Sequence, residues 1–88
     1  MHEASLMKGL MGKVEDLARE HGADRITRIR VKLGALSHFS PDHFREHFEH
    51  ASRGTLAEGA ALEIELLTDI LDPRAQDVIL DSADVEQP

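Results

Sequence analysis

The stretch from residue 26 to residue 33 alternates between two kinds of residue, and this alternation constrains the fold more than any other feature. One set is apolar or β-branched and the other is basic: Thr27, Ile29, Val31 and Leu33 against Arg28, Arg30 and Lys32. A period of two with β-branched residues is typical of a strand with one buried face. Such a strand needs a second layer to cover its apolar side.

Residues 3–21 have the spacing of an amphipathic helix. Their apolar side chains recur on one helical stripe: Leu6, Leu10, Val14, Leu17 and Ala18, widened by Met7 and Met11. Gly22 is typical of the position that ends a helix. This helix is therefore a candidate for the covering layer.

A second helix is predicted over residues 41–52. Ser40 can cap its start, and Pro41 suits the first helical position because no needed donor is lost there. Phe44 and Phe48 then form its apolar stripe.

Two further strands complete the pattern. Residues 62–66 alternate apolar and acidic side chains, and residues 78–85 form a weaker strand because acidic residues and a serine dilute its pattern. The order is α-β-α-β-β. A strand, helix and strand of this length favour a right-handed parallel crossover, and the short link before the last strand favours an antiparallel return. The sequence predicts an α/β two-layer sandwich, with two helices on one face of a three-stranded mixed sheet.

Composition excludes several kinds of protein. The 88 residues include no cysteine, so disulfides, thiolate zinc sites and cysteine nucleophiles are ruled out. The formal charge of −7 disfavours nucleic acid and anionic membranes as partners. There is no apolar run near 18 residues and no signal-peptide pattern, so a cytoplasmic location is expected. No catalytic motif is present, and an enzyme is not expected.

The first three residues, Met1-His2-Glu3, can chelate a metal. The α-amino nitrogen, the deprotonated amide of His2 and its imidazole Nδ1 would form fused small rings, and Glu3 would add a carboxylate or another amide. Nitrogen-rich tetragonal sites suit Ni(II) and Cu(II). Taken alone, a histidine at position two is more often part of a solvated terminus.

Other candidate groups have simpler explanations. His43, His47 and His50 share one stripe of the second helix; two of them could share a metal, but a solvated polar face is the commoner reason for such a stripe. His38 is interpreted as a turn residue, and His21 as a favourable charge at a helix end. The basic face of residues 28–32 is either the solvent side of the sheet or a docking surface for an acidic partner.

Beyond these patterns, the sequence resembles the HypA/HybF family of hydrogenase nickel-insertion accessory proteins. The resemblance covers most of the chain and rests on these segments: Met1-His2-Glu3, the Leu6/Leu10/Val14/Ala18 helix, Gly22-Ala23-Asp24-Arg25-Ile26, Val31-Lys32-Leu33-Gly34, Pro41 with Phe44 and Phe48, Gly54-Thr55, Ala57-Glu58-Gly59-Ala60, Leu62-Glu63-Ile64, Val78-Ile79-Leu80 and Val85-Glu86. The set is specific, although each piece alone is not.

The resemblance implies a nickel-binding metallochaperone. It implies His2 as the nickel ligand, with backbone nitrogens of the terminus, from Met1 onward, and a contribution from Glu3. It further implies delivery of Ni(II) to the large subunit of [NiFe] hydrogenase with a GTPase partner, which contacts the N-terminal helix. Some members of the family also serve urease.

One departure from the family is clear. Members carry a zinc-binding domain with two Cys-x-x-Cys pairs between the second and third strands, and here the insert expected between about residues 68 and 77 is absent. We therefore expect a single nickel-binding domain over residues 1–88 and no zinc. An alternative is a degenerate paralogue that acts as a protein-interaction module without metal delivery. A homodimer through an open sheet edge is also possible.

Overall fold

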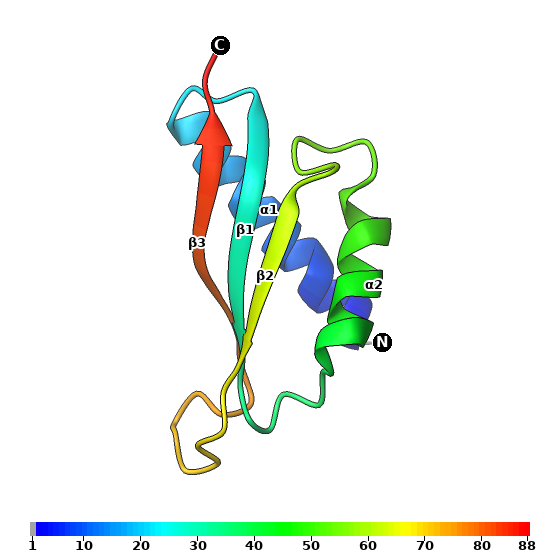
Figure 1. Cartoon of the computed structure of the whole chain (residues 1–88), viewed down its shortest axis with the longest axis vertical. Coiled ribbons are helices and arrows are strands. Elements are labelled where there is room, and N and C mark those ends of the chain that lie inside the picture. The colour runs from blue at the N-terminus through cyan, green and yellow to red at the C-terminus, as the bar shows by residue number, and fades with distance from the viewer. Residues whose placement is uncertain (1) are drawn as a thin grey trace.

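The computed structural model describes the backbone of residues 2–88 and the side chains of residues 4–88. Two helices and three strands follow one another in the predicted order: α1 (His2–Glu20), β1 (Arg25–Leu33), α2 (Pro41–Ser52), β2 (Ala61–Leu66) and β3 (Val78–Glu86) (Figure 1). Each boundary lies within one residue of the expected one. The predicted fold class is confirmed.

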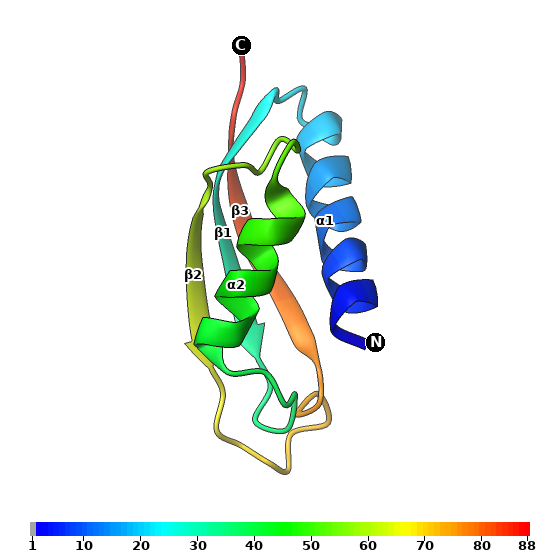
Figure 2. The same ribbon diagram turned by 90° about the vertical axis from the view of Figure 1, so that its right-hand side faces the viewer.

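The strands form one mixed sheet with β1 in the centre, in the order β2-β1-β3. β2 is parallel to β1 and β3 is antiparallel to it. Both helices lie on the same face of this sheet, as Figure 2 shows edge-on. The antiparallel direction of β3 follows the expectation, but its neighbour is β1 and not β2, the strand that precedes it in sequence.

The alternation in β1 slips by one residue near its start. Ile26 is fully buried, whereas Thr27 is only half-buried and donates its hydroxyl proton to the Asp84 carbonyl. The pairing with β3 shifts register between Ile26 and Arg28, which is the signature of a bulge. The expectation that Thr27 shares the buried face with Ile29 was therefore wrong, because an extra residue at the bulge moves Ile26 onto that face.

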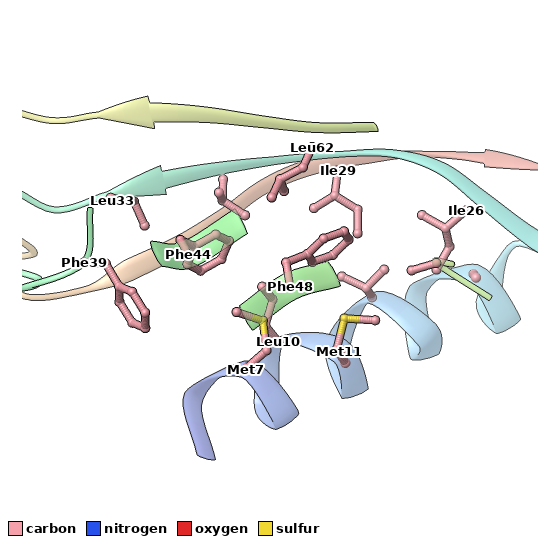
Figure 3. Close-up of a cluster of buried hydrophobic side chains, with 14 residues drawn as sticks. Met7, Leu10, Met11, Ile26, Ile29, Leu33, Phe39, Phe44, Phe48 and Leu62 are labelled. Atoms are coloured by element: carbon pink, nitrogen blue, oxygen red, sulfur yellow. The ribbon is translucent and has the colours of Figure 1, made fainter. Parts of the chain in front are cut away.

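The core lies between the helices and the sheet. Phe44 and Phe48 of α2 stand between the inner face of β1 and the methionines Met7 and Met11 of α1 (Figure 3). All four side chains are buried, and Phe44 is completely so. The two predicted apolar stripes thus meet each other as well as the sheet, which fixes how α1 lies against α2.

Local signals fix the helix ends. The Ser40 hydroxyl accepts a hydrogen bond from the His43 amide at 3.2 Å, and Pro41 is the first helical residue, as predicted. Gly22, after α1, has a φ of 64°, which glycine adopts without strain.

Residues 67–77 join β2 to β3 across the end of β1. Three backbone hydrogen bonds tie this link to the last residue of β1 and the segment that follows it: Leu67 N to Leu33 O, Gly34 N to Asp77 O and Leu36 N to Ala75 O. The contact is so close at Gly34 that an added Cβ would lie 2.2 Å from the Ala75 oxygen. Although it contains no regular structure, the link is held against the sheet end.

Candidate metal centre

The predicted nickel ligands are at the start of α1. Met1 and the side chains of His2 and Glu3 lie outside the described residues, so their placement remains a prediction. The backbone of His2 and Glu3 forms the first turn of α1. The first N–H groups of an α-helix have no intrahelical acceptor, so backbone amides at this position are not committed to the helix.

Packing fixes the direction in which α1 presents its first turn. Met7, Leu10 and Val14 bury one stripe of the helix in the core. The N-terminal end of α1 therefore lies on the helical side of the sheet, in the half of the molecule that also holds the first turns of α2 (Figures 1 and 2).

Two of the three histidines in α2, His43 and His47, contact each other, and His50 lies apart from that contact. The Nε2 atoms of His43 and His47 lie 3.0 Å apart, so that one ring donates and the other accepts according to tautomer. His50 is exposed on the last turn of α2. Among the side chains of residues 4–88, no group of three or more histidine, aspartate or glutamate residues is placed to hold a metal.

His38 and His21 lie outside α2. His38 is exposed in the loop before α2 with a left-handed φ of 65°, as suits a turn residue. His21 follows α1, and its carbonyl oxygen accepts a hydrogen bond from the Gln87 side chain.

Sequence reasoning missed Phe39, which shapes the surroundings of the histidine pair. It is buried and packs edge-on against Phe44, with ring centroids 5.5 Å apart. Its ring also lies near both imidazoles, at 5.9 Å from His43 and 6.3 Å from His47. Phe39 precedes the cap residue and Phe44 is the fourth helical residue, which is the spacing of a hydrophobic staple. That spacing is the sequence signal that could have found it.

The basic face of β1 is occupied by contacts within the domain. Arg30 forms two hydrogen bonds of 3.1 Å with the Asp84 carboxylate of β3, and it lies 3.3 Å from Glu63 of β2. Arg28 also contacts Glu63, and Lys32 lies 3.9 Å from Asp81. These cations pair across the three strands on the outer face of the sheet. The interpretation of this face as the solvent side is therefore favoured over a docking surface for an acidic partner.

Two of these paired groups, Arg30 and Asp84, have shifted pKa values. The hydrogen bond from Arg30 holds the pKa of Asp84 below its ordinary value, and burial opposes that effect. The reciprocal bond to Asp84 raises the pKa of Arg30. Both groups are therefore charged at neutral pH. Their role is to pair β1 with β3 and not to exchange protons.

Comparison with known proteins gives a consistent result. The chain matches the family model described as "Hydrogenase/urease nickel incorporation, metallochaperone, hypA" over residues 1–71. The hydrogenase maturation factor HypA of Methylocella silvestris is 43% identical over 67 residues, which cover 76% of this chain and 59% of that protein. The HypA of Paracoccus denitrificans is 44% identical over 64 residues, covering 73% and 57%. The matched part of the chain thus spans less than two thirds of these relatives.

Solved structures agree on the fold. The solution structure of the Ni metallochaperone HypA from Helicobacter pylori superimposes with a TM-score of 0.82 and 19% identity, over 98% of both chains. A second solution structure of a HypA protein gives a TM-score of 0.75 at 21% identity, over 97% of this chain and 96% of that one. Within the described residues, no helix combines the length and the apolar character that crossing a membrane requires.

Proposed function

The chain belongs to the HypA family of nickel metallochaperones, and we propose that it binds Ni(II) through Met1, His2 and Glu3 for the maturation of [NiFe] hydrogenase. The observation that supports this most directly is the family match, which begins at residue 1 and so includes all three proposed ligands. The ligand set would be the α-amino nitrogen, the His2 amide nitrogen and Nδ1, with an oxygen or amide from Glu3.

The position of these residues is compatible with such a chelate. Backbone amides in the first turn of α1 lack intrahelical acceptors, so deprotonating one to bind nickel breaks no helical hydrogen bond. The amine and the amide must both lose protons when metal binds, so affinity falls at acidic pH. A bulky residue at position two keeps Met1 in place, which preserves the amine as a ligand.

Delivery is the second part of the proposal. Nickel is the cargo, and the chain passes it on without chemical change, so we propose a metallochaperone and not an enzyme. We further propose that a hydrogenase-maturation GTPase docks on α1, and that the large subunit of [NiFe] hydrogenase receives the metal in the cytoplasm. No zinc is proposed to bind, because the chain has no cysteine.

One observation favours a second candidate function. A short tethered link over residues 67–77 joins β2 to β3 at the place where the family resemblance implies a zinc-binding domain. A degenerate paralogue would keep the fold and a docking surface without delivering metal. β2 and β3 are also both edge strands, so a homodimer through one of them is a further proposal, which light scattering at two concentrations tests.

Calorimetric titration of untagged protein with Ni(II) tests the metal proposal. The parent should bind nickel, and His2→Ala should bind it much more weakly. Protein with a blocked N-terminus should behave like His2→Ala, since the amine is a proposed ligand. His21→Ala, at the other end of α1, is the matched control and should bind like the parent. Equal affinity in His2→Ala and the parent would show that the ligand set is wrong.

Hydrogenase maturation in cells separates the two functions. If His2→Ala fails to support hydrogenase activity, nickel delivery is favoured. If the variant still binds the GTPase and supports full activity, the chain is an interaction module. The second result would overturn delivery even where the titration shows nickel binding.

A further inference from the structure

The large apolar side chains that are exposed within residues 4–88 all lie in or beside the link between β2 and β3. Four residues form this group, which we call the link patch: Leu36, Leu66, Ile70 and Leu71. Leu36 follows β1, and its amide joins it to the link through the Ala75 carbonyl. The Leu71 side chain is 86% exposed and that of Ile70 is 61% exposed. Exposed apolar residues that gather in one region mark a contact site for another molecule.

The link holds Ile70 and Leu71 in a fixed backbone conformation. The Asp69 carboxylate accepts a hydrogen bond from the Leu71 amide at 2.9 Å, and the Asp72 carboxylate accepts one from the Arg74 amide at 2.7 Å. Neither Ile70 nor Leu71 belongs to the hydrophobic core, so the fold gives no reason for two such apolar side chains here. A surface that is ordered before binding loses little conformational freedom when a partner arrives.

The charges around the link patch are mostly negative. Residues 67–77 contain three aspartates and one arginine, and the Arg74 guanidinium lies 3.4 Å from the Asp77 carboxylate. Asp69 and Asp72, on either side of Ile70 and Leu71, give the apolar surface an acidic rim. Two copies of the chain that met through this surface would bring like charges together, and the net charge of −7 adds to that repulsion. The same aspartates disfavour an anionic membrane.

We infer that the link patch is a docking surface for a partner protein that presents an apolar segment flanked by lysine or arginine. The side chains of Ile70 and Leu71 would be buried against the apolar segment. Asp69 and Asp72 would face its cations and set the orientation of the partner. This surface is separate from the cationic face of β1, which is occupied by pairs within the sheet.

The link patch lies at the end of the molecule where α1 begins. Val78, the first residue of β3 after the link, lines one groove with Leu6 and Leu10 from the first half of α1. Figures 1 and 2 show the start of α1 and the link in the same half of the molecule. A partner on the link patch therefore sits near the end that carries the proposed nickel ligands. Its part in nickel transfer rests on the proposed function.

NMR titration of the full chain with a defined peptide tests the docking surface. The probe is a synthetic amphipathic helix with a leucine face flanked by lysine and arginine. It should shift the amide signals of residues 66–77 before those of the rest of the chain, and a peptide with glutamate in place of the basic residues should not. First shifts elsewhere would overturn the inference. So would the same shifts on raising the concentration of the chain alone, or on adding phosphatidylcholine vesicles while the peptide has no effect.

Two pairs of substitutions separate the apolar contact from the charged rim. Ile70→Ser with Leu71→Ser should weaken peptide binding at least about tenfold, because both large side chains leave the contact. Asp69→Asn with Asp72→Asn should weaken it about fivefold at low salt and less at high salt. Asparagine keeps the side-chain oxygen that accepts the turn hydrogen bond, so the link retains its conformation. Unchanged affinity in either pair would overturn the inference.

The matched control makes the same change of net charge at the opposite end of the molecule. Asp24 and Glu86 are exposed there, where the Asp24 amide donates to the Glu86 carbonyl. Asp24→Asn with Glu86→Gln should bind the peptide almost like the parent. A loss equal to that of the link variants would mean that overall charge, and not the link patch, attracts the peptide.

Nickel titration and hydrogenase maturation test the part in transfer. The Ile70→Ser, Leu71→Ser chain should bind Ni(II) with the affinity of the parent but support little hydrogenase activity in cells, whereas the charge control should keep both. Full activity in the link variant would overturn the part in transfer. A parent that binds no nickel would refute the proposed function instead, and the peptide titration decides the docking surface without reference to nickel.

Discussion

Gly34 should be the least replaceable glycine in the domain. It follows β1, where the 67–77 link crosses the end of the strand. A Cβ at this position would lie 2.2 Å from the Ala75 oxygen and 2.8 Å from the Arg74 oxygen, and both neighbours are backbone atoms. Backbone cannot rotate away as a side chain can, so Gly34→Ala must push the link off the sheet end.

The magnitude follows from what that movement breaks. The Ala75 oxygen accepts the Leu36 amide at 2.7 Å, and the Asp77 oxygen accepts the Gly34 amide at 2.9 Å. Two lost hydrogen bonds cost about 1 kcal/mol each, and exposure of the Ala75 methyl costs about 0.8 kcal/mol. We expect a loss of about 2–3 kcal/mol from a total stability of roughly 4–13 kcal/mol.

Thermal unfolding followed by circular dichroism measures this loss. For a domain of this size the expected change is a fall in Tm of roughly 10–20 °C. Hydrogen exchange should show the Leu36 amide losing protection first. Gly12→Ala is the matched control, because Gly12 lies within α1 with nothing within 4 Å of an added Cβ, and it should gain about 0.5–1 kcal/mol. A Tm for Gly34→Ala within about 2 °C of the parent would refute the reasoning.

Two further substitutions test the Arg30–Asp84 ion pair and the Ser40 cap of α2. Because its folded pKa is lowered, Asp84 contributes stability above its ordinary pKa and loses it as the pH falls through the folded value. Asp84→Asn should therefore lower Tm at pH 7, and the difference from the parent should shrink as the pH falls through the folded pKa of Asp84; a difference that stays constant from neutral to acidic pH would contradict the role of Arg30. Ser40→Ala should cost about 1 kcal/mol in urea unfolding, with early amide exchange at His43, and unchanged exchange there would mean that the cap does not stabilise α2.

The elements were predictable because their signals are local. Ser40 and Pro41 start α2 where the sequence places the start, and Gly22 follows α1 as expected. Each signal concerns a few neighbouring residues and needs no knowledge of the rest of the chain.

The sheet was only partly predictable, because strand order is decided by contacts between distant residues. The polar residues of β3 weakened its strand pattern, yet Ser82 and Asp84 are partners of Arg30 across the ladder. They are polar because Asp84 supplies a carboxylate and Ser82 a hydroxyl to accept hydrogen bonds from Arg30 of β1. The bulge that displaces Thr27 is equally a property of the β1–β3 pair and not of β1 alone.

For the candidate sites, too, the sequence shows which residues are available but not how the folded chain arranges them. The nickel ligands at Met1, His2 and Glu3 stay a prediction from sequence and family resemblance. The spacing of His43 and His47 was visible in the sequence, but a solvated stripe explained it equally well. The 3.0 Å hydrogen bond between their Nε2 atoms and the contact with Phe39 depend on the folded structure, so the sequence alone could not show them.

The central position of β1 has a consequence for the order of folding. No strand of this sheet pairs with a hairpin neighbour. The paired residues of β1 and β2 lie 33 positions apart, as Arg28 and Ala61 do, and those of β1 and β3 lie 45 to 61 positions apart, from Leu33 with Val78 to Arg25 with Glu86. Chains dominated by such distant pairings fold slowly, because loop closure precedes any stabilising contact. During synthesis, α1 and α2 leave the ribosome long before β3 can close the sheet. Until then the edge of β1 that pairs with β3 is open to other chains, and such an unpaired edge is a route to aggregation.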